Sequence, residues 1–500
     1  MLKSTLLLSS LLPLCVIAGQ QNPYSSRPVD TPPKVSAELP DISRYNQAFF
    51  HEQLSSWSHQ AEITLQRLPE QGLLRRFQLI TDMTLQAKAQ GAVPQILVIE
   101  NGLASLEDIA AKFPHALIPD ESKPNTYLAR FPILVRGDAA ILIDDGEELR
   151  LSEERRTFLV GGGEFFVLDA TINSWRESTN SPSYWSGNKS DYRAFYSVWN
   201  GSKTFFYNSS FESLGYFRTK AYGISLASQK LSDHELQTMP WMENTRSTGV
   251  LMNNKFIDIY YGFYCYKAED VVILGNEYID NVVYGIDPHD YSERLVIAKN
   301  ITHGTLQKHG IIISREVNNS FIFDNISFNN HRSGIMLDRS SENNLIVNNR
   351  TFDNGGDGIT LQESNNNFVI NNLAYNNQEH GINIRNSQHI SLYNNKLIAN
   401  GGAGIYGHTD NLSEHTHRDL TLDPFTAKVS FTASGGSIIA NKSAAINVSD
   451  FEFATLGNIS FGENGNSYNT NFLGDLKPFF EVFAQNVNDA TALQVQKTKD

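Results

Sequence analysis

A run of glycines at nearly constant spacing is the feature that most limits how this chain can fold. Seven of them follow one another at steps of 23, 25, 24, 24, 23 and 23 residues, namely Gly262, Gly285, Gly310, Gly334, Gly358, Gly381 and Gly404. Most open a short apolar run, such as Ile311-Ile-Ile313, and a second apolar run recurs in phase, such as Val271-Val-Ile273. A period near 24 with β-branched runs is typical of stacked strands and disfavours helical repeats. The sequence therefore predicts an all-β chain, a right-handed parallel β-helix with small helical caps.

Asparagine recurs at two phases of this repeat, which indicates the corners between strands. One series is Asn276, Asn300, Asn325, Asn349, Asn372 and Asn395, and the other is Asn330, Asn354, Asn377 and Asn400. We expect asparagine at such corners because it tolerates left-handed backbone and its amide forms local hydrogen bonds.

The two ends of the chain depart from the repeat. Residues 1–18 join Lys3 to an apolar run and are predicted to be a secretory signal peptide, with no membrane span after its removal. Residues 19–45, rich in Pro and Ser, are predicted to be a flexible N-terminus. Residues 46–130 are expected to form an N-terminal cap and the first rungs, with a helix from Ser105, its N-cap, to Lys112. The β-helix is assigned to residues 131–475, and a C-terminal cap or tail to residues 476–500.

Charge and cysteine content restrict the partners and the sources of stability. The formal net charge is −14 at pH 7, which argues against binding to nucleic acid or to anionic membranes. An anionic polymer would be repelled as well, unless basic side chains gather in one groove. Of the two cysteines, Cys15 lies in the predicted signal peptide, so Cys265 is expected to form no intrachain disulfide.

The segment Tyr284-Gly-Ile-Asp-Pro-His-Asp290 gathers a phenol, two carboxylates and an imidazole. Three ionisable side chains this close are costly to bury without partners, so Asp287, His289 and Asp290 are expected to serve a site rather than the core. A hydrogen-bonded turn built on Asp287-Pro288 is the structural alternative.

The repeat also predicts the neighbours of this segment. The second and fourth residues after each glycine should point outward, so Asp287 and His289 share one face, and equivalent residues of successive rungs lie about 4.8 Å apart. Tyr266 and Ser314 then flank His289. The other candidates on this face are Lys267 and Arg315 beside Asp290; Tyr261, Tyr284 and His309 with Lys308 in a parallel column; and Arg339, Glu363, Arg385 and His408 farther along.

This set suits the removal of a proton α to a carboxylate, which needs a general base and a cation that neutralises the carboxylate. His289 is the candidate base, supported by Asp287 and Asp290, and Arg315 is the candidate cation. Tyr284 could relay a proton on the opposite face. The structural alternative for Arg315 is a plain ion pair with Asp290 or Glu316; Lys267 and Lys308 could equally be solvated surface.

Two other chemistries fit less well. Paired carboxylates occur in β-helical glycoside hydrolases, but Asp287 and Asp290 share one short loop, and residues 311–314 contain no further Asp. His415 and His417 suggest a metal, but they lack a third ligand at a familiar spacing, so a solvated loop is the preferred interpretation. We expect no metal and no cofactor.

Residues 284–290 resemble the signature of the mannuronan C5-epimerases. Lys308-His-Gly-Ile-Ile-Ile-Ser-Arg-Glu-Val317, Tyr260-Tyr-Gly-Phe-Tyr-Cys-Tyr266 and Leu422-Asp-Pro-Phe425 are similar to the periplasmic members in particular. The resemblance runs from about Tyr127 to Asp475. It implies a periplasmic enzyme that converts β-D-mannuronate to α-L-guluronate within alginate, beside the proteins that modify and secrete the polymer.

Carried over by motif, the resemblance gives His289 as the base, Arg315 as the carboxylate neutraliser, and Asp287 and Asp290 as supports. Tyr284 corresponds to the second acid/base of the secreted epimerases, whereas water is proposed for that role in the periplasmic ones. The calcium-binding repeats of the secreted enzymes are absent from this sequence.

Two further functions stay open at this stage. An alginate lyase shares the first step and then expels the 4-O substituent instead of accepting a proton. A non-catalytic β-helix that guides alginate through the periplasm is the binding-protein alternative.

Overall fold

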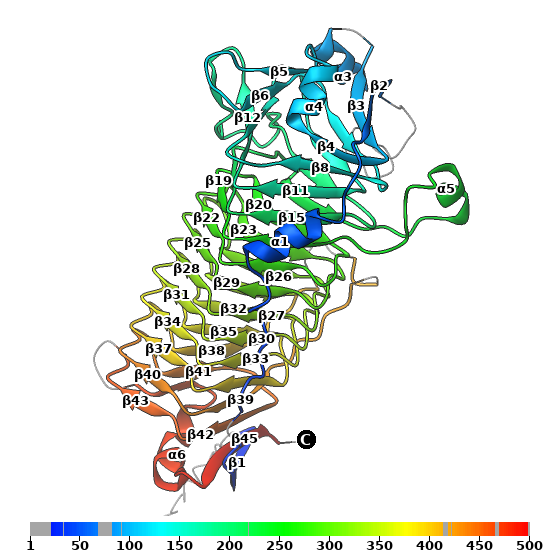
Figure 1. Ribbon diagram of the computed structural model, residues 1–500. Helices are drawn as coiled ribbons and strands as arrows, with labels where there is room; N and C mark the ends of the chain where they lie inside the picture. The colour runs from blue at the N-terminus through cyan, green and yellow to red at the C-terminus, as the bar shows by residue number, and fades with distance from the viewer. Residues whose placement is uncertain are drawn as a thin grey trace, which may run out of the picture.

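The computed structural model describes residues 22–33, 35–68, 83–91, 93–218, 220–413, 419–421, 423–465 and 470–498. Within them the chain forms the predicted parallel β-helix, a long stack of rungs in which three sheets run the length of the column (Figure 1). The predicted signal peptide and the His415/His417 segment lie outside the described residues. Among the residues described, no helix is long and apolar enough to cross a membrane.

The first sheet joins the two ends of the chain. In spatial order its strands are β4 (Gly102–Ser105), β8 (Ala139–Ile143), β11 (Glu164–Leu168), β15 (Lys203–Tyr207), β18 (Thr248–Met252), β21 (Val272–Leu274), β24 (Val296–Ala298), β27 (Phe321–Phe323), β30 (Leu345–Val347), β33 (Phe368–Ile370), β36 (Ile390–Tyr393), β39 (Ser430–Ser434), β42 (Phe453–Gly457), β45 (Thr491–Lys497) and β1 (Tyr24–Asp30). The last two strands pair antiparallel.

The second sheet carries the motif at residues 284–290. Its strands are β2 (Glu62–Arg67), β3 (Gln95–Glu100), β7 (Ile133–Val135), β10 (Leu159–Gly161), β14 (Tyr196–Val198), β17 (Gly223–Ala227), β20 (Tyr261–Tyr266), β23 (Tyr284–His289), β26 (Ile311–Ser314), β29 (Ile335–Asp338), β32 (Ile359–Gln362), β35 (Ile382–Arg385), β38 (Ile405–His408), β41 (Ile446–Val448) and β44 (Phe472–Gly474). Parallel pairing begins with β3 and β7.

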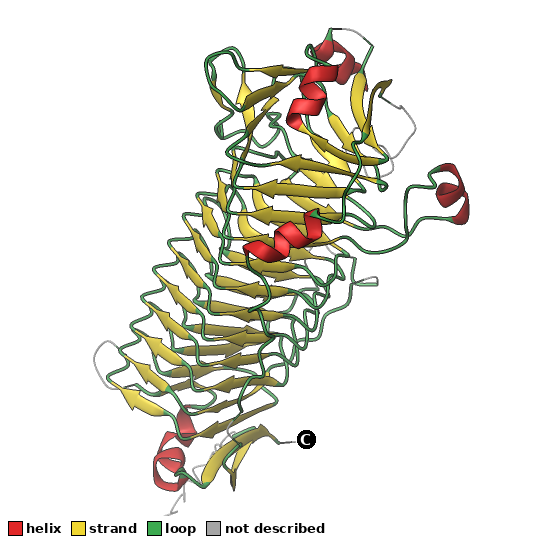
Figure 2. Ribbon diagram, in the orientation of Figure 1, coloured by secondary structure: helices red, strands yellow, loops and turns green. Residues whose placement is uncertain are grey.

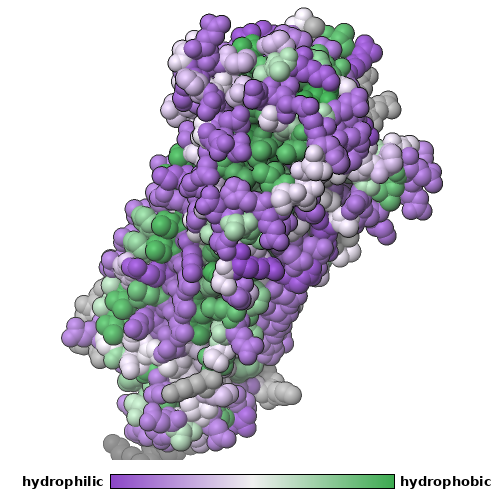
Figure 3. Space-filling model, in the orientation of Figure 1, coloured by the Kyte–Doolittle hydropathy of each residue, from purple (hydrophilic) through white to green (hydrophobic). Residues whose placement is uncertain are grey.

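The third sheet consists of β5 (Leu117–Pro119), β6 (Thr126–Ala129), β9 (Glu148–Ser152), β12 (Thr171–Arg176), β16 (Ser210–Glu212), β19 (Lys255–Ile257), β22 (Glu277–Ile279), β25 (Ile301–His303), β28 (Ile326–Phe328), β31 (Arg350–Phe352), β34 (Leu373–Tyr375), β37 (Lys396–Ile398), β40 (Ser437–Ile439) and β43 (Ser460–Gly462), with β13 (Ser181–Pro182) paired to β12. Its outer face carries a stack of rings from His303 through Phe328 and Phe352 to Tyr375, at centroid spacings of 5.0, 4.9 and 4.8 Å. Apolar side chains interrupt the polar surface along this edge in Figure 3.

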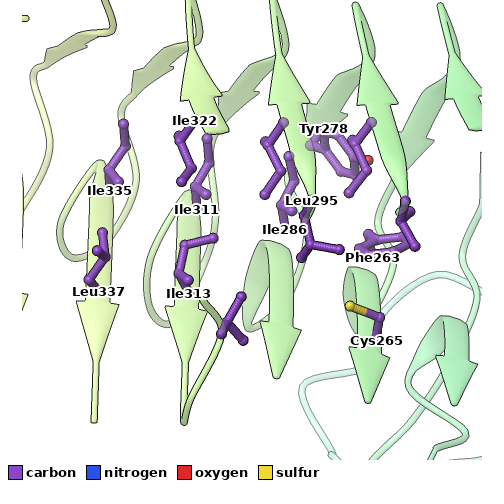
Figure 4. Packing of buried hydrophobic residues seen from close by; sticks show 14 of the residues in the cluster. Phe263, Cys265, Tyr278, Ile286, Leu295, Ile311, Ile313, Ile322, Ile335 and Leu337 are labelled. Carbon is purple, nitrogen blue, oxygen red and sulfur yellow. The ribbon is translucent and has the colours of Figure 1, made fainter. Parts of the chain in front are cut away.

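The core fills the space between the three sheets. Ile286, Ile311 and Ile335 lie in register on neighbouring strands and are fully buried. Figure 4 shows this inward column beside Ile313 and Leu337, with Cys265 in the same layer. The first and third residues after each glycine therefore point inward, as the alternation of apolar residues predicted, and the outward positions are left for chemistry.

The asparagine series does mark corners, but the expected left-handed backbone at the asparagines is wrong, and local hydrogen bonding is the lesser part of what their amides do. None of the ten asparagines has a positive φ; the residue before each one takes the left-handed conformation instead, as Asn348 does at φ 56°. The asparagine itself is buried and bonds mainly between rungs, with additional local bonds at Asn330 and Asn372. Asn349 donates through Nδ2 to the Ile322 carbonyl at 2.8 Å and to Asn372 Oδ1 at 3.0 Å. Each series is thus an internal amide ladder.

Helices lie at the ends and on the flanks of the column (Figure 2). They are α1 (Gln47–Leu54), α3 (Met83–Gln90), α4 (Leu106–Lys112), α5 (Asp233–Thr238), a 3₁₀ turn (Lys477–Phe479) and α6 (Phe480–Asn486). Ser105 caps α4 and forms a capping box with Asp108, which confirms the predicted helix. The C-terminal tail holds the expected helix, but residues 491–497 form strand β45 instead of continuing it.

The N-terminus of the described chain is not the flexible segment that its composition predicted. Residues 24–30 form β1, which pairs with β45 along its whole length at the far end of the column. The chain then runs back along the column to α1, as Figure 1 shows. On the way Val35, Leu39 and Ile42 pack on the outer face of the first sheet. Apolar contact with that face holds the segment, although its Pro and Ser content suggested a solvated chain.

Candidate active site

One pocket of about 370 Å³ opens on the outer face of the second sheet, over strands β17, β20, β23 and β26. Its lining consists of Lys220, Tyr222, Gln229, Tyr261, Tyr264, Tyr266, Tyr284, Asp287, His289, Asp290 and Arg315. The predicted register is confirmed, because His289 pairs with Tyr266 on one side and with Ser314 on the other. The parallel stack therefore brings residues from distant parts of the sequence together around the 284–290 segment.

His289 is held by the residue that follows it. Its Nδ1 atom forms a short hydrogen bond with Asp290 Oδ2, and its backbone carbonyl accepts a bond of 2.9 Å from the Ser292 hydroxyl. The Asp290 carboxylate also faces the Arg315 guanidinium at 3.7 Å. Because Nδ1 is engaged, Nε2 is the ring nitrogen left to take a proton from a substrate.

Three influences set the basicity of His289. Burial lowers its pKa, but the hydrogen bond to Asp290 and the charges of Asp287 and Asp290 outweigh burial, so the pKa lies above its usual value. An imidazole shifted in this direction is a stronger base than a free histidine. The site therefore holds a histidine that is more basic than a free one.

Asp287 is the residue whose environment differs most from expectation. It was predicted to avoid the core, yet only 1% of it is exposed, and its Oδ1 atom has no hydrogen-bond partner among the described residues. Burial raises its pKa to about 7, and the charge of Asp290 adds to the effect. Tyrosine side chains surround the Asp287 carboxyl. Its burial without a partner for each oxygen is tolerated because the carboxyl is partly protonated at neutral pH.

Tyr284 lies at the edge of the pocket next to a cation. Lys308 Nζ donates to its phenol oxygen at 3.1 Å, and the ring meets Tyr261 edge-on at 5.1 Å. Burial raises the pKa of Tyr284.

His309, predicted as a substrate ligand, stacks parallel to Tyr284 at 6.2 Å, and its Nδ1 accepts a bond from the Ser333 amide. Burial lowers the pKa of His309 to about 3, so it is neutral at the pH at which His289 would act.

A second, larger groove of about 960 Å³ continues along the same face, and His309 and Arg385 contribute to its wall together with Arg332, Asp357 and His408. Arg385 also contacts Asp410 at 3.3 Å. Three predicted ligands, Lys267, Lys308 and Arg339, line neither cavity. Arg339 pairs with Asp338 and Asp423, and Lys267 lies over the rings of Tyr266 and Tyr291.

Four residues of the pocket were not anticipated from the sequence. Tyr264 could have been found, since it occupies the same position of its rung as Asp287 and pairs with it. Its ring centroid lies 5.8 Å from that of His289. Lys220, Tyr222 and Gln229 surround β17, whose glycine precedes Gly262 by 39 residues, so the 24-residue period gave no signal for them.

Metal-binding geometry is not evident in this pocket. Over the described part of the chain, no three His, Cys, Asp or Glu side chains gather as they would around an ion. The alternative metal ligands His415 and His417, and Leu422 of the 422–425 motif, are outside that part.

Comparison with known proteins places this site in a family. Residues 215–418 match the family model described as "Periplasmic copper-binding protein (NosD)". The chain is 42% identical over 419 residues to a mannuronan C5-epimerase of Pseudomonas aeruginosa, covering 83% of this chain and 75% of the relative. It is 47% identical over 360 residues to the mannuronan C5-epimerase AlgG of Azotobacter vinelandii, covering 72% and 67%. The crystal structure of a periplasmic alginate epimerase AlgG superposes with a TM-score of 0.78 at 37% identity, over 87% of this chain and 99% of that one.

Identity at this level spans the rungs that carry the pocket as well as the column that supports them. The chain therefore belongs to the mannuronan C5-epimerase family and is a periplasmic isomerase of that family.

Proposed function

We propose that this enzyme converts β-D-mannuronate residues to α-L-guluronate within alginate, with His289 as the base that removes the C5 proton. The observation that carries the proposal is the His289–Asp290 hydrogen bond, in a pocket that also holds Asp287 and Arg315. Relatives named mannuronan C5-epimerase support the substrate class.

In the first step Nε2 of His289 takes the proton at C5. The C5–H bond breaks, its electron pair moves into the neighbouring carboxylate, and an enediolate forms. Arg315 lies 3.7 Å from the Asp290 carboxylate, and its guanidinium would bind the oxygens on which this charge develops. Asp287, when protonated, would donate a hydrogen bond to the same group, since its Oδ1 points to no partner within the described chain.

In the second step a proton must reach C5 from the opposite face of the sugar. Tyr284 is our candidate donor, because the Lys308 ammonium bonded to its oxygen would stabilise the phenolate that remains. A water molecule is the alternative donor. Before the next cycle the His289 imidazolium releases its proton to solvent and the phenolate or hydroxide regains one, so protons balance over one turnover.

The larger groove supports a polymeric substrate rather than a free sugar. It continues from the catalytic pocket over later rungs, and Arg332, Arg385 and His408 line it. We propose Arg385 and His309 as ligands of distal sugar residues. Lys267 and Arg339 are weaker candidates, because they would reach a polymer only outside the two cavities, and Lys308 is assigned to the Tyr284 oxygen instead.

The proposed reaction moves protons only, and imidazole, guanidinium and phenol supply the groups that it needs. We therefore propose that no metal or cofactor takes part. We also propose that the enzyme works beside the periplasmic proteins that modify and secrete alginate, since its substrate is the polymer that they carry.

The test is to incubate the purified mature enzyme with polymannuronate and to record proton NMR and ultraviolet spectra. We expect guluronate signals without new chain ends. Shortened chains with unsaturated, ultraviolet-absorbing ends would make the enzyme a lyase. A polymer that binds but stays unchanged would leave only the role of a periplasmic guide.

A further inference from the structure

We propose that Lys220, together with Gln229, binds the carboxylate of the uronate residue next to the one that reacts, at the end of the catalytic pocket opposite Arg315. This inference rests on the proposed function and specifies how the pocket recognises two consecutive acidic sugars.

The order of the rungs places Lys220 and Arg315 on opposite sides of His289. Lys220 precedes β17, His289 ends β23, and Arg315 follows β26. Adjacent strands are about 4.8 Å apart, so these four rungs extend for roughly 14 Å along the column. That length exceeds one sugar ring. A polymer lying along the column would therefore place a neighbouring uronate over β17 and β20 while the reacting one is at His289.

The Lys220 ammonium points toward the catalytic residues. Its Nζ atom lies 4.8 Å from the ring centroid of Tyr266, the residue that pairs with His289 in the adjacent strand. The Lys220 ammonium thus lies over a side chain of β20, the strand adjacent to the one that carries the base. Cation–π contact with Tyr266 fixes the direction of the side chain and leaves the ammonium at the pocket wall.

Burial distinguishes Lys220 from the other basic residues of this face. It is 5% exposed, whereas the Arg315 side chain is 48% exposed. A charge in such surroundings is screened less by water, so its attraction to a carboxylate is stronger than at an open surface.

The backbone on both sides of this subsite is fixed. The Ala221 amide donates to the Arg218 carbonyl at 2.9 Å, and the Tyr261 amide donates to the Tyr222 carbonyl at 2.8 Å, which ties the Lys220 loop to β20. The Gln229 amide donates to Asn200 Oδ1 at 2.8 Å. Both side chains are therefore presented by anchored backbone, which reduces the ordering needed when a ligand binds.

This position predicts a distinct kinetic effect. Lys220 would hold the neighbouring sugar equally in the ground state and in the transition state, because the charge that develops at C5 belongs to the other residue. Its loss should then raise KM and leave kcat nearly unchanged. Arg315, which would meet the developing charge, should affect kcat instead.

The experiment compares Lys220→Met and Lys220→Arg with wild type on polymannuronate. We expect Lys220→Met to raise KM by roughly tenfold or more with kcat within about twofold, and Lys220→Arg to recover most of the affinity, as a lost charged hydrogen bond predicts. Lys396→Met, an exposed lysine on the third sheet, is the matched control and should behave as wild type. Thermal unfolding of each variant separates a folding defect from a binding one, and Lys220→Gln replaces Lys220→Met if the latter does not fold.

A polymannuronate in which part of the carboxyl groups is reduced to alcohols tests the ligand directly. Wild type should lose affinity for it, and Lys220→Met should lose less. An active wild type with an unchanged KM in Lys220→Met overturns the Lys220 inference alone. Equal falls of kcat in Lys220→Met and Lys220→Arg overturn it as well, because they would indicate a structural role. An inactive wild type refutes the proposed function instead.

Discussion

Asp290 binds the imidazole of the residue directly before it, His289, although side chains of consecutive strand residues normally point to opposite faces. The contact forms because β23 ends at His289 and Asp290 turns to a φ of 32°. The turn folds the carboxylate back onto Nδ1. The chain thus builds the base and its support from two adjacent residues, and β20, β26 and the segments that flank β17 supply most of the rest of the pocket.

Replacing Asp290 by Asn should weaken the base. The amide cannot carry the charge that raises the pKa of His289, so that pKa should fall. His289 acts as a base in its neutral form, so the rising limb of the profile of kcat/KM against pH should move to lower pH. The rate should drop by roughly 10- to 100-fold, the effect of losing a charged hydrogen bond. The control is Glu316→Asn, which changes an exposed carboxylate on the next rung and should leave the rising limb of the pH profile in place. If that limb does not move in Asp290→Asn, Asp290 does not set the pKa of the base.

Asp287 should make stability depend on pH. Its pKa is about 7 in the folded state and near 3.8 when unfolded, so the folded chain holds the extra proton between these values. Its contribution is fully present below pH 3.8 and is lost as pH rises through 7, by an amount on the order of 4 kcal/mol. As pH rises from 5 to 8, the free energy of unfolding measured with urea should therefore fall less for Asp287→Asn than for wild type. Asp353→Asn, at an exposed turn, is the control; parallel losses in wild type and Asp287→Asn would show that Asp287 is ionised throughout.

Substitution of Asn349 in the amide ladder should lower the free energy of unfolding, whereas substitution of its neighbour Asn348 should have little effect on it. Asn349→Ala removes the acceptor for the Asn325 amide and the donor to the Ile322 carbonyl, leaving buried backbone groups without partners. We expect a loss of about 2–4 kcal/mol in the free energy of unfolding. Asn348→Gly should be nearly neutral, since Asn348 is exposed and glycine adopts its φ of 56° readily. Similar losses in both variants would argue against the ladder as the stabilising element.

The N-terminal strand should stabilise the far end of the column. Tyr24 accepts a bond of 3.1 Å from the Phe451 amide, donates to Asp475 at 3.3 Å, and stacks on Phe451 at 4.4 Å. Tyr24→Ala should destabilise the fold by about 3 kcal/mol and speed hydrogen exchange in β45, with kcat unchanged at 25 °C. Tyr24→Phe keeps the stack and should cost about 1 kcal/mol. If exchange in β45 stays slow in Tyr24→Ala, β1 does not hold this end.

The sequence predicted the column and the centre of the site because both depend on local periodicity. Equal glycine spacing implies equal register, and equal register places Tyr266, His289 and Ser314 side by side. The position of Lys220 escaped prediction, since the rung that carries it is longer than the repeat. Burial of Asp287 also escaped, because the tyrosines that cover it come from other rungs. The path of residues 35–57 along the first sheet depends on contacts distant in sequence, for which composition gives no signal.

The most direct test of His289 as the base is deuterium incorporation at C5. Polymannuronate is incubated in D₂O with wild type and with His289→Gln, and proton NMR follows the C5 position. We predict guluronate carrying deuterium at C5 with wild type, and neither guluronate nor exchange with His289→Gln when its thermal unfolding matches that of wild type. Deuterium appearing at C5 with a folded His289→Gln variant at the wild-type rate would contradict the account.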